Sequence, residues 1–305
     1  KGMANIMNTT QTDGKAKIGV LGGDRRQIAM AEVLAASGYE VALAGFERYD
    51  GEICLPTRCI GTEGAVRGAA AVILPLPYSQ DHVRLHAPYA DGDILLDDMF
   101  AQLKPTQMVL GGRFHETAHA LAKRAGVTVY DYSEREAFCI ANAVPTAEGA
   151  VAIAMERLPV TLHGSRCTVI GYGRIGRILC RLLASFGAHV TATARKPADL
   201  AWIRAEGYRA MDTRQLSFCE SRPDVIFNTV PNPVLTADLL EQLGESTLVV
   251  DLASRPGGVD RIAAQRLGVP TVWALSLPGK TSPVTAGRIA ALSVLEILRE
   301  EGVTT

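Results

Sequence analysis

Short apolar runs recur along this chain, and each is followed by a glycine-containing turn and an amphipathic stretch. One such unit begins at residues 18–21 and another at residues 167–170, and in both a further apolar run follows the amphipathic stretch. This succession predicts strand–turn–helix–strand units, which are the βαβ signal of a doubly wound parallel sheet.

The two units match at a constant offset of 149 residues, the separation between Leu34 and Leu183 (183 minus 34). Gly38 and Gly187 then occupy equivalent positions ahead of the second strand, and residues 71–77 resemble residues 224–231. The repeat predicts an α/β protein with two Rossmann-like doubly wound parallel-sheet domains flanking a cleft.

The linker between the halves, residues 133–157, is helix-like, and we expect it to be interrupted at Val144–Pro145. Proline lacks an amide donor and disfavours helix at the preceding residue. Beyond Pro283, apolar positions at helical spacing predict a last helix that packs back on the first domain. The predicted segments are a flexible tail (1–16), an N-terminal Rossmann-like substrate domain (17–140), an NAD(P)-binding Rossmann domain (141–282) and the C-terminal helix (283–305).

Composition and charge narrow the class of protein. The chain carries 31 Lys+Arg against 32 Asp+Glu, for a net charge of −1. This balance argues against non-specific electrostatic binding to nucleic acid or anionic lipid. No run approaches the ~18 apolar residues of a membrane span, and the polar first 17 residues do not look like a secretory signal. Six scattered cysteines without a Cys-x-x-Cys pair favour reduced thiols. We expect a cytoplasmic protein.

The strongest motif is Gly171-Tyr-Gly173-Arg174-Ile175-Gly176, which lies between a predicted strand and a predicted helix. In such a loop the first glycine makes a tight turn, the second lets the backbone approach a pyrophosphate, and the third lets helix pack on strand. The five residues Gly171, Gly173, Arg174, Ile175 and Gly176 are therefore predicted to bind a dinucleotide.

The end of the second strand bears on the choice of cofactor. In NAD-selective loops a carboxylate about 20 residues on binds the ribose hydroxyls, but here the segment reads Thr193-Ala-Arg195-Lys196. These cations predict NADP, with NAD possible; the alternative is that both are solvated surface cations.

The nicotinamide end of the cofactor is predicted at the fourth strand of the domain. That strand ends in Asn228-Thr229-Val230-Pro231, and the carboxyl edge of the sheet is where this end of the cofactor normally lies. Alternatively, Asn228 and Thr229 cap a turn.

The equivalent turn of the first half has charge in place of glycine. Asp24 and Gln27 stand where the cofactor loop has Gly173 and Gly176, and Arg25 and Arg26 lie between them. A helix N-terminus with two guanidinium groups suits a small carboxylate, so Asp24, Arg25 and Arg26 are predicted to bind substrate. The alternative is a pair of surface arginines.

His115-Glu-Thr-Ala-His119 matches the HExxH pattern of zinc proteases. It falls on a short crossover helix, expected at residues 114–125, rather than on the long central helix that such an active site needs. We predict a solvated first turn and no metal.

Two further cationic positions follow late strands of the second half. Arg255, in Asp251-Leu-Ala-Ser-Arg-Pro-Gly-Gly258, is suited to bidentate binding of a carboxylate. Lys280, followed by Thr281 and Ser282, lies between two prolines and is a candidate anion ligand or general acid/base. A surface lysine is the alternative for Lys280.

Taken together, these motifs resemble the A-subunit family of the dipicolinate synthases of spore-forming bacteria, over nearly all of residues 17–300. The motifs that carry the resemblance are Gly22-Gly-Asp-Arg-Arg-Gln27, Ser133-Glu-Arg-Glu136, Pro145-Thr-Ala-Glu-Gly149, Gly171–Gly176, Asp251–Gly258 and Leu277-Pro-Gly-Lys280.

The resemblance implies oxidation of a dihydrodipicolinate by a nicotinamide cofactor. It further implies a flavoprotein-like partner, the B-subunit of the synthase, and a role in the mother-cell cytoplasm during sporulation. A homo-oligomer is also expected.

The architecture is similar to D-2-hydroxyacid dehydrogenases as well, but their Glu–His acid/base pair has no counterpart, since no histidine follows His189. This favours aromatisation of a ring over oxidation of a secondary alcohol. The alternatives are an NADP-linked 2-hydroxyacid or imino-acid oxidoreductase and a regulatory subunit that binds NADP without chemistry.

On the favoured hypothesis, the two ring carboxylates of the substrate lie against Arg255 and the Arg25/Arg26 helix end. Lys280, with Thr281 or Ser282, is the candidate for proton transfer or anchoring. Asn142, in the linker stretch, is a further predicted substrate-binding residue.

Overall fold

The computed structural model describes residues 15–55, 61–219 and 222–305, and the chain divides into two compact units. The first contains the described residues up to Glu134 together with Ala290–Thr305, and the second is Arg135–Ile289. The division thus lies at residues 134/135 and 289/290 rather than at 140/141 and 282/283. Most of the predicted tail, residues 1–14, lies outside the described residues.

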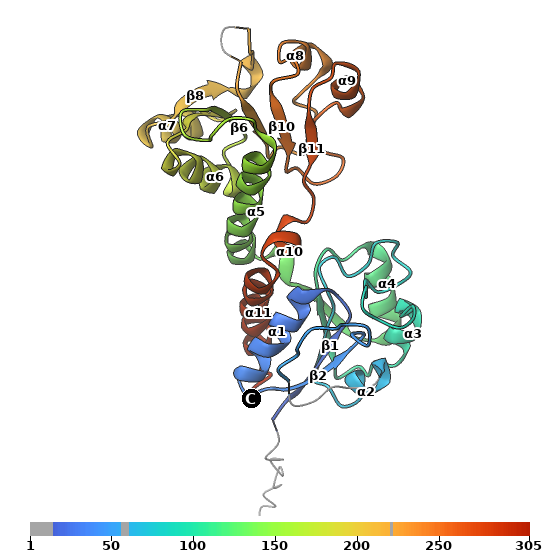
Figure 1. Cartoon of the computed structure of the whole chain (residues 1–305). Coiled ribbons are helices and arrows are strands. Elements are labelled where there is room, and N and C mark those ends of the chain that lie inside the picture. Colours follow the sequence, from blue (N-terminus) through green and yellow to red (C-terminus); the bar gives the residue numbers. More distant parts are fainter. Residues whose placement is uncertain (1–14, 56–60, 220–221) are drawn as a thin grey trace, which may run out of the picture. The chain divides into compact units, whose positions relative to one another are not determined.

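The first unit is built on a five-stranded parallel sheet in the order β2-β1-β3-β4-β5 (Figure 1). This is the flavodoxin-like doubly wound order, in which the strand sequence reverses between β1 and β3. Its strands are β1 (Lys17–Leu21), β2 (Glu40–Ala44), β3 (Ala71–Ile73), β4 (Met108–Gly111) and β5 (Thr128–Asp131), and its helices are α1 (Arg25–Ala36), α2 (Thr62–Val66), α3 (Leu96–Ala101) and α4 (Glu116–Ala125).

The second unit has a six-stranded parallel sheet in the order β11-β10-β9-β6-β7-β8. Numbered from β6, this is the Rossmann order, with the reversal between β6 and β9. The strands are β6 (Arg166–Ile170), β7 (His189–Ala194), β8 (Arg209–Asp212), β9 (Val225–Asn228), β10 (Leu248–Asp251) and β11 (Thr271–Trp273), and the helices between them are α6 (Arg174–Ser185), α7 (Pro197–Ala205), α8 (Ala237–Glu241) and α9 (Arg261–Arg266).

The predicted repeat is present at the start of each unit. β1 and β6 begin 149 residues apart (166 minus 17), and so do β2 and β7 (189 minus 40). The correspondence then breaks, because the first unit goes directly to β3, the counterpart of β9, and its sheet has no counterpart of β8 among the described residues. The two units are both doubly wound, as predicted, but the Rossmann order belongs to the second.

The linker helix corrects the expected interruption at Val144–Pro145. α5 (Glu136–Arg157) runs without interruption through Pro145, and the Thr146 hydroxyl donates to the Asn142 carbonyl 2.8 Å away beside it. α5 is also long and apolar enough to cross a membrane by length and composition. Its Ala147, Ala150 and Ala154 are fully buried in the hydrophobic core of the second unit. Packing against the core accommodates Pro145 within the helix and explains the apolar composition of α5. We therefore interpret α5 as a core helix.

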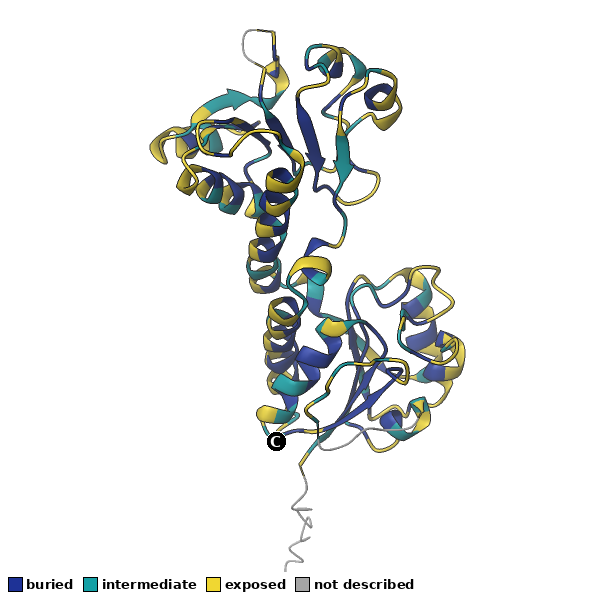
Figure 2. Ribbon diagram, viewed as in Figure 1, coloured by how far each residue is buried: buried dark blue, intermediate teal, exposed yellow. Residues whose placement is uncertain are grey.

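The C-terminal helix α11 (Pro283–Glu300) begins where the sequence predicts it. Ala291, Val294 and Leu298 on this helix are fully buried, and the chain after it is tied to the first unit, since the Tyr39 hydroxyl donates to the Val303 carbonyl at 2.9 Å. In each unit the strands form the buried layer, with exposed positions on the outer faces of the helices (Figure 2).

Candidate dinucleotide and substrate sites

The carboxyl ends of β6 and β9 meet at the topological switch point of the second sheet, where doubly wound proteins bind their ligands. β6 ends at Ile170 and leads directly into Gly171, whose φ is +96°. A Cβ at Gly171 would lie 2.4 Å from the Thr229 hydroxyl, just beyond β9, and 2.8 Å from the Val230 side chain. Only glycine fits this turn, because both its backbone angle and its surroundings exclude a side chain.

The other two glycines of the motif have opposite surroundings. A Cβ at Gly176 would lie 2.0 Å from the Gly171 carbonyl oxygen, whereas a Cβ at Gly173 would meet nothing within 4 Å. Gly176 therefore allows the close packing of α6 on β6. Gly173 borders open space at the N-terminus of α6.

That open space suits a pyrophosphate. Gly173 is the N-cap of α6 and supplies no side-chain hydrogen bond to the first helical turn, so the amides of that turn are available to an anion. The Gly171–Gly176 loop has the shape and donors that a dinucleotide requires. A nicotinamide dinucleotide bound there would supply the hydride acceptor of an oxidation.

Arg174 and Ile175 contribute through their backbone. The Arg174 guanidinium binds Glu136 of α5 through two hydrogen bonds of 2.9 and 2.5 Å, and this contact lowers the pKa of Glu136. Ile175 is partly buried against the core. Both side chains make contacts within the protein. The groups that Arg174 and Ile175 could present to a phosphate are therefore their backbone amides.

Beyond β7 the chain carries two exposed cations. Arg195 and Lys196 directly follow the end of the strand, and within the described residues neither has a carboxylate partner. Thr193, in contrast, is fully buried, and its hydroxyl accepts from Thr213 at 2.9 Å. Thr193 supports the turn, whereas Arg195 and Lys196 are free to meet a ligand.

Asn228 has structural partners. It is fully buried, and its amide nitrogen donates to Asp251 at 2.8 Å and to the Val230 carbonyl at 3.0 Å. The Val230 amide in turn donates to the Asn228 side-chain oxygen at 3.2 Å. Of the two interpretations of Asn228, the turn cap fits these contacts.

Asp251 holds the loop that carries Arg255. Besides Asn228, its carboxylate accepts from the amides of Ala253 (3.1 Å) and Gly258 (3.0 Å), one at each end of the loop. Asp251 is 1% exposed, and buried carboxylates need such a full set of donors. The pattern of the motif alone did not mark Asp251 as a site residue, although an acidic residue at the carboxyl end of a buried strand is a usable signal.

Thr229, Val230 and Pro231 form the wall beside Gly171. The Thr229 hydroxyl donates to the Ile170 carbonyl at 2.9 Å, joining β9 to β6 at the switch point. Val230 is half-buried and Pro231 is exposed. These residues lie at the edge where the sequence predicts the nicotinamide.

Arg255 is an exposed cation over an aromatic ring. Its guanidinium carbon lies 5.8 Å from the centroid of Trp273, whose indole nitrogen donates to the Ala253 carbonyl at 3.0 Å. Arg261 lies over the same indole at 4.0 Å. Arg255 has no carboxylate partner among the described residues. Its guanidinium is therefore available for bidentate hydrogen bonding to an anion.

Lys280 and its neighbours form a short helix rather than an extended loop. α10 (Leu277–Thr281) packs against α5, where a Cβ at Gly149 would lie 3.2 Å from the Thr281 side chain. The Thr281 hydroxyl donates to the Leu277 carbonyl at 2.9 Å. Lys280 is exposed, and neither it nor the Ser282 hydroxyl has a described partner. The Lys280 ammonium and the Ser282 hydroxyl are available to donate to a ligand, whereas the Thr281 hydroxyl already donates to a carbonyl within α10.

In the first unit, the turn at residues 22–27 is predicted to bind an anion. The carboxylate of Asp24 occupies that position. Asp24 caps α1, accepting from the Arg26 amide at 3.0 Å and from the Arg26 guanidinium at 2.9 and 2.8 Å. Burial acts to raise the pKa of Asp24, but the hydrogen bonds and charge of Arg26 outweigh it and lower the pKa. Arg26 is thereby neutralised, and Arg25 is the exposed cation of this turn.

Two residues beside this turn, Gln27 and His86, are not among the predicted site residues. Gln27 is 2% exposed and its amide nitrogen has no hydrogen-bond partner among the described residues. The pKa of His86 is lowered, mainly because its imidazole is desolvated. The His86 carbonyl accepts from the Gly23 amide at 2.7 Å. No local pattern marks His86, because 63 residues (86 minus 23) separate it from Gly23.

The Asp24–Arg26 pair predicts a pH dependence of stability. Because the folded pKa of Asp24 lies below its ordinary 3.8, its contribution is fully present above pH 3.8 and is lost as the pH falls through the folded pKa. We expect wild type to be more stable than Asp24→Asn at pH 7 and the difference to shrink below pH ~3.8, measured by urea unfolding. Asp91→Asn, an exposed aspartate of the same unit, is the control; a pH-independent difference would contradict the assignment.

The HExxH residues His115, Glu116 and His119 are exposed at the start of α4, which fits the predicted solvated first turn. α4 begins at Glu116, so His115 is its N-cap and its ring nitrogen accepts from the Thr117 amide at 3.4 Å. The His115 ring stacks on His82 with centroids 4.2 Å apart. In the described part of the chain no three His, Cys, Asp or Glu side chains gather as metal ligands.

The five described cysteines form no disulfide with one another. Cys167 and Cys180 are buried, and burial raises their thiol pKa values to about 11 and about 12. Cys54 and Cys219 are exposed and Cys139 is half-buried, while Cys59 lies outside the described residues. The buried thiols stay protonated and unreactive at neutral pH.

Comparison with known proteins agrees with both halves of this description. Residues 17–133 match the family described as the N-terminal domain of the dipicolinate synthase A-subunit, and residues 142–261 match the NAD binding domain of D-isomer specific 2-hydroxyacid dehydrogenases. The dipicolinate synthase A-subunit of Bacillus subtilis (strain 168) is 33% identical over 294 residues, which cover 94% of this chain and 98% of the relative. The chain belongs to the dipicolinate synthase A-subunit family.

Solved structures of this family have the same fold. The A-subunit structure from Bacillus halodurans matches with a TM-score of 0.84 at 29% identity, covering 93% of this chain and 97% of that one. The Bacillus subtilis structure matches with a TM-score of 0.84 at 30% identity, covering 94% and 97%. The predicted family and the doubly wound two-domain fold are confirmed, and the second unit is a nicotinamide-dinucleotide-binding domain of an oxidoreductase.

Proposed function

We propose that this chain is the oxidoreductase subunit of a dipicolinate synthase and oxidises dihydrodipicolinate to dipicolinate with NADP. The substrate ring loses one hydride and one proton and becomes aromatic, and the hydride reduces the nicotinamide. The observation that carries the proposal is the open space beside Gly173 at an uncapped helix N-terminus. Family membership supplies the substrate class, and we place the reaction in the cytoplasm of a sporulating cell.

Arg255 is the proposed ligand of a ring carboxylate. It is exposed, lacks a carboxylate partner among the described residues and is fixed at the sheet edge by the Asp251 loop. A planar dicarboxylate suits its bidentate donor face. Lys280 is the proposed proton-transfer or anchoring group, because its ammonium is exposed and has no described partner. In the first unit, Arg25 replaces the neutralised Arg26 as the candidate anion ligand.

The proposal is tested by nicotinamide reduction with enzymatically generated dihydrodipicolinate, with and without the flavoprotein-like B-subunit. Arg255→Ala is expected to lower kcat/KM roughly 30- to 1,000-fold, which corresponds to about 2 to 4 kcal/mol for the loss of a charged contact. Arg266→Gln, an exposed arginine on α9, is the control. Wild-type turnover by both Arg255→Ala and Lys280→Ala would contradict the assignment of these residues. Dinucleotide binding without turnover, even with the B-subunit present, would identify a regulatory role instead.

Cofactor choice is predicted to depend on Arg195. We expect Arg195→Ala to reduce the ratio of kcat/KM for NADP to that for NAD by roughly 10- to 100-fold, because a hydrogen bond to a charged group contributes about 1.5 to 3 kcal/mol. Arg204→Ala, on the exposed side of α7, is the matched control. A wild-type preference for NAD, or a ratio that Arg195→Ala leaves unchanged, would reject NADP.

A further inference from the structure

One face of the β6–β7–β8 half-sheet is polar in part. Residues of β6 and β7 that face helices α5 and α6 are apolar, among them Cys167, Val169 and Ala192. On the opposite face the alternate positions are Thr168 and Ile170 in β6 and Thr191 and Thr193 in β7, and of these Ile170 is buried in a second hydrophobic cluster. Parallel sheets are ordinarily covered by apolar packing on both faces, so the hydroxyls of Thr168 and Thr191 offer polar groups where apolar packing is usual.

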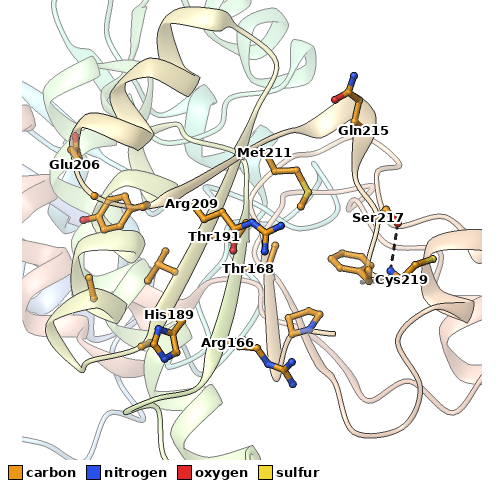
Figure 3. A pocket seen from close by; sticks show the side chains of 17 residues that line it. Arg166, Thr168, His189, Thr191, Glu206, Arg209, Met211, Gln215, Ser217 and Cys219 are labelled. Atoms are coloured by element: carbon orange, nitrogen blue, oxygen red, sulfur yellow. Dashed lines mark hydrogen bonds between the residues drawn. The ribbon is translucent and has the colours of Figure 1, made fainter. Parts of the chain in front are cut away.

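A groove lies over this polar face. It has a volume of about 890 Å³ (Figure 3). It is lined by strand residues of β6, β7 and β8, by the segment that follows β8, and by residues 184, 188 and 206–208, which precede β7 and β8. That segment, the crossover to β9, contains the short 3-10 turn Thr213–Gln215 and no α-helix among its described residues. In place of the usual covering helix, the described residues of this crossover bury Leu216 and Phe218 in one hydrophobic cluster with Ile170, and the groove lies beside them.

Strand register brings three donors into one row on the floor of the groove. Thr168 pairs with Thr191, and Thr191 pairs with Arg209 of β8. Neighbouring strands lie about 4.8 Å apart, so two hydroxyls and a guanidinium follow one another across three strands. Figure 3 shows the Arg209 side chain extending over the sheet beside Thr191 and Thr168.

These donors have no partners in the described protein. In residues 15–55, 61–219 and 222–305, the hydroxyls of Thr168 and Thr191 make no hydrogen bond and Arg209 has no ion pair. Arg166, also in the lining, faces Asp224 at 3.7 Å, and Glu206 is the carboxylate of the lining. An available guanidinium beside two available hydroxyls favours an oxyanion.

We propose that this groove binds the phosphate group of a small phosphorylated molecule, at a site separate from the dinucleotide loop. Three donors from three adjacent strands match the several oxygens of a phosphate, whereas a planar carboxylate is satisfied by a guanidinium alone. Met211 and Phe218 provide an apolar wall for the rest of the ligand, and the volume is that of an ordinary small-molecule site.

The site lies at the far end of the strands from the cofactor. Arg166 and His189, the first residues of β6 and β7, line the groove, whereas the dinucleotide loop follows the last residue of β6. Occupancy of one site therefore does not block the other. The proposal is independent of the substrate and of the reaction assigned above.

The test is calorimetric titration of the whole chain with inorganic pyrophosphate at constant ionic strength, with the dinucleotide loop saturated by NADP or NAD. We expect saturable binding that Arg209→Gln weakens at least about 10-fold and Thr191→Val about 5-fold, in line with the strengths of charged and neutral hydrogen bonds. Arg266→Gln, outside the groove, should bind as wild type does.

Three results would overturn the proposal. They are absence of saturable binding, equal weakening by Arg209→Gln and Arg266→Gln, and tighter binding of a dicarboxylate than of pyrophosphate with the same dependence on Arg209. Thermal unfolding of each variant checks that the fold is retained; Thr168→Val, which keeps the shape of the side chain, replaces Arg209→Gln if that variant unfolds. The turnover assay tests the proposed oxidation independently of this titration. A negative titration would therefore reject the phosphate site and not the proposed oxidation.

Discussion

Replacing Gly176 by alanine is expected to lower the free energy of unfolding by about 3 kcal/mol and to abolish dinucleotide binding. The added Cβ would lie 2.0 Å from the Gly171 carbonyl oxygen, and the obstructing atom is backbone rather than a flexible side chain. To make room, α6 must move away from β6, which displaces the amides that would face the pyrophosphate. Urea unfolding and calorimetric titration with NADP and NAD measure the two effects.

Gly173→Ala is the matched control, because it adds the same methyl group to the same loop. A Cβ at Gly173 meets nothing within 4 Å and its φ of −90° suits alanine. We therefore expect wild-type stability but at least roughly 10-fold weaker dinucleotide binding, because the methyl group enters the space that the pyrophosphate needs. Equal stability of the two variants would mean that helix and strand are not packed through Gly176 as the structure has them.

Asp251→Ala is the second substitution expected to have a large effect. It removes the acceptor of three hydrogen bonds, from Asn228, Ala253 and Gly258, in a fully buried position. Each unsatisfied buried donor costs about 1 to 3 kcal/mol, so we expect a loss of about 3 kcal/mol or more in the free energy of unfolding. Because two of these bonds hold the loop of Arg255, turnover should fall as well.

Two further variants separate the contribution of Asp251 from a general loss of charge. Asp251→Asn keeps one acceptor oxygen and should fall between wild type and Asp251→Ala in both stability and turnover. Asp238→Asn removes an exposed aspartate from the first turn of α8 and should stay within about 0.5 kcal/mol of wild type. A stable Asp251→Ala with wild-type turnover would show that the buried network does not position Arg255.

Local patterns predict the elements of this fold well where neighbouring residues decide the conformation. The apolar run before Gly171 forms β6, and Gly171, Gly173 and Gly176 each have the surroundings that their spacing implies. The 149-residue offset correctly matches β1 with β6 and β2 with β7. Turn sterics and strand periodicity operate over a few residues, so the sequence carries them directly.

Local patterns mislead where distant residues compensate. The sequence predicts an interruption at Val144–Pro145, yet α5 continues through it, and Ala147, Ala150 and Ala154 beyond the proline are buried in the core of the second unit. At the HExxH pattern the sequence predicts only a solvated first turn, whereas in the structure His115 also caps α4 and stacks on His82, 33 residues earlier (115 minus 82). Periodicity cannot reveal either outcome, since each depends on contacts outside the pattern.

The sequence by itself determined the doubly wound class, the family and the dinucleotide loop, because glycine sterics and apolar periodicity are properties of adjacent residues. Only the tertiary structure decided which polar groups are paired within the protein and which remain available to bind a ligand. Asn228 and Asp251, 23 residues apart, satisfy each other in the core, and Asp24 neutralises Arg26. Conversely, sheet register aligned Thr168, Thr191 and Arg209 in one row across three strands. The physical reason is that hydrogen-bond and charge pairing depends on which strands become neighbours.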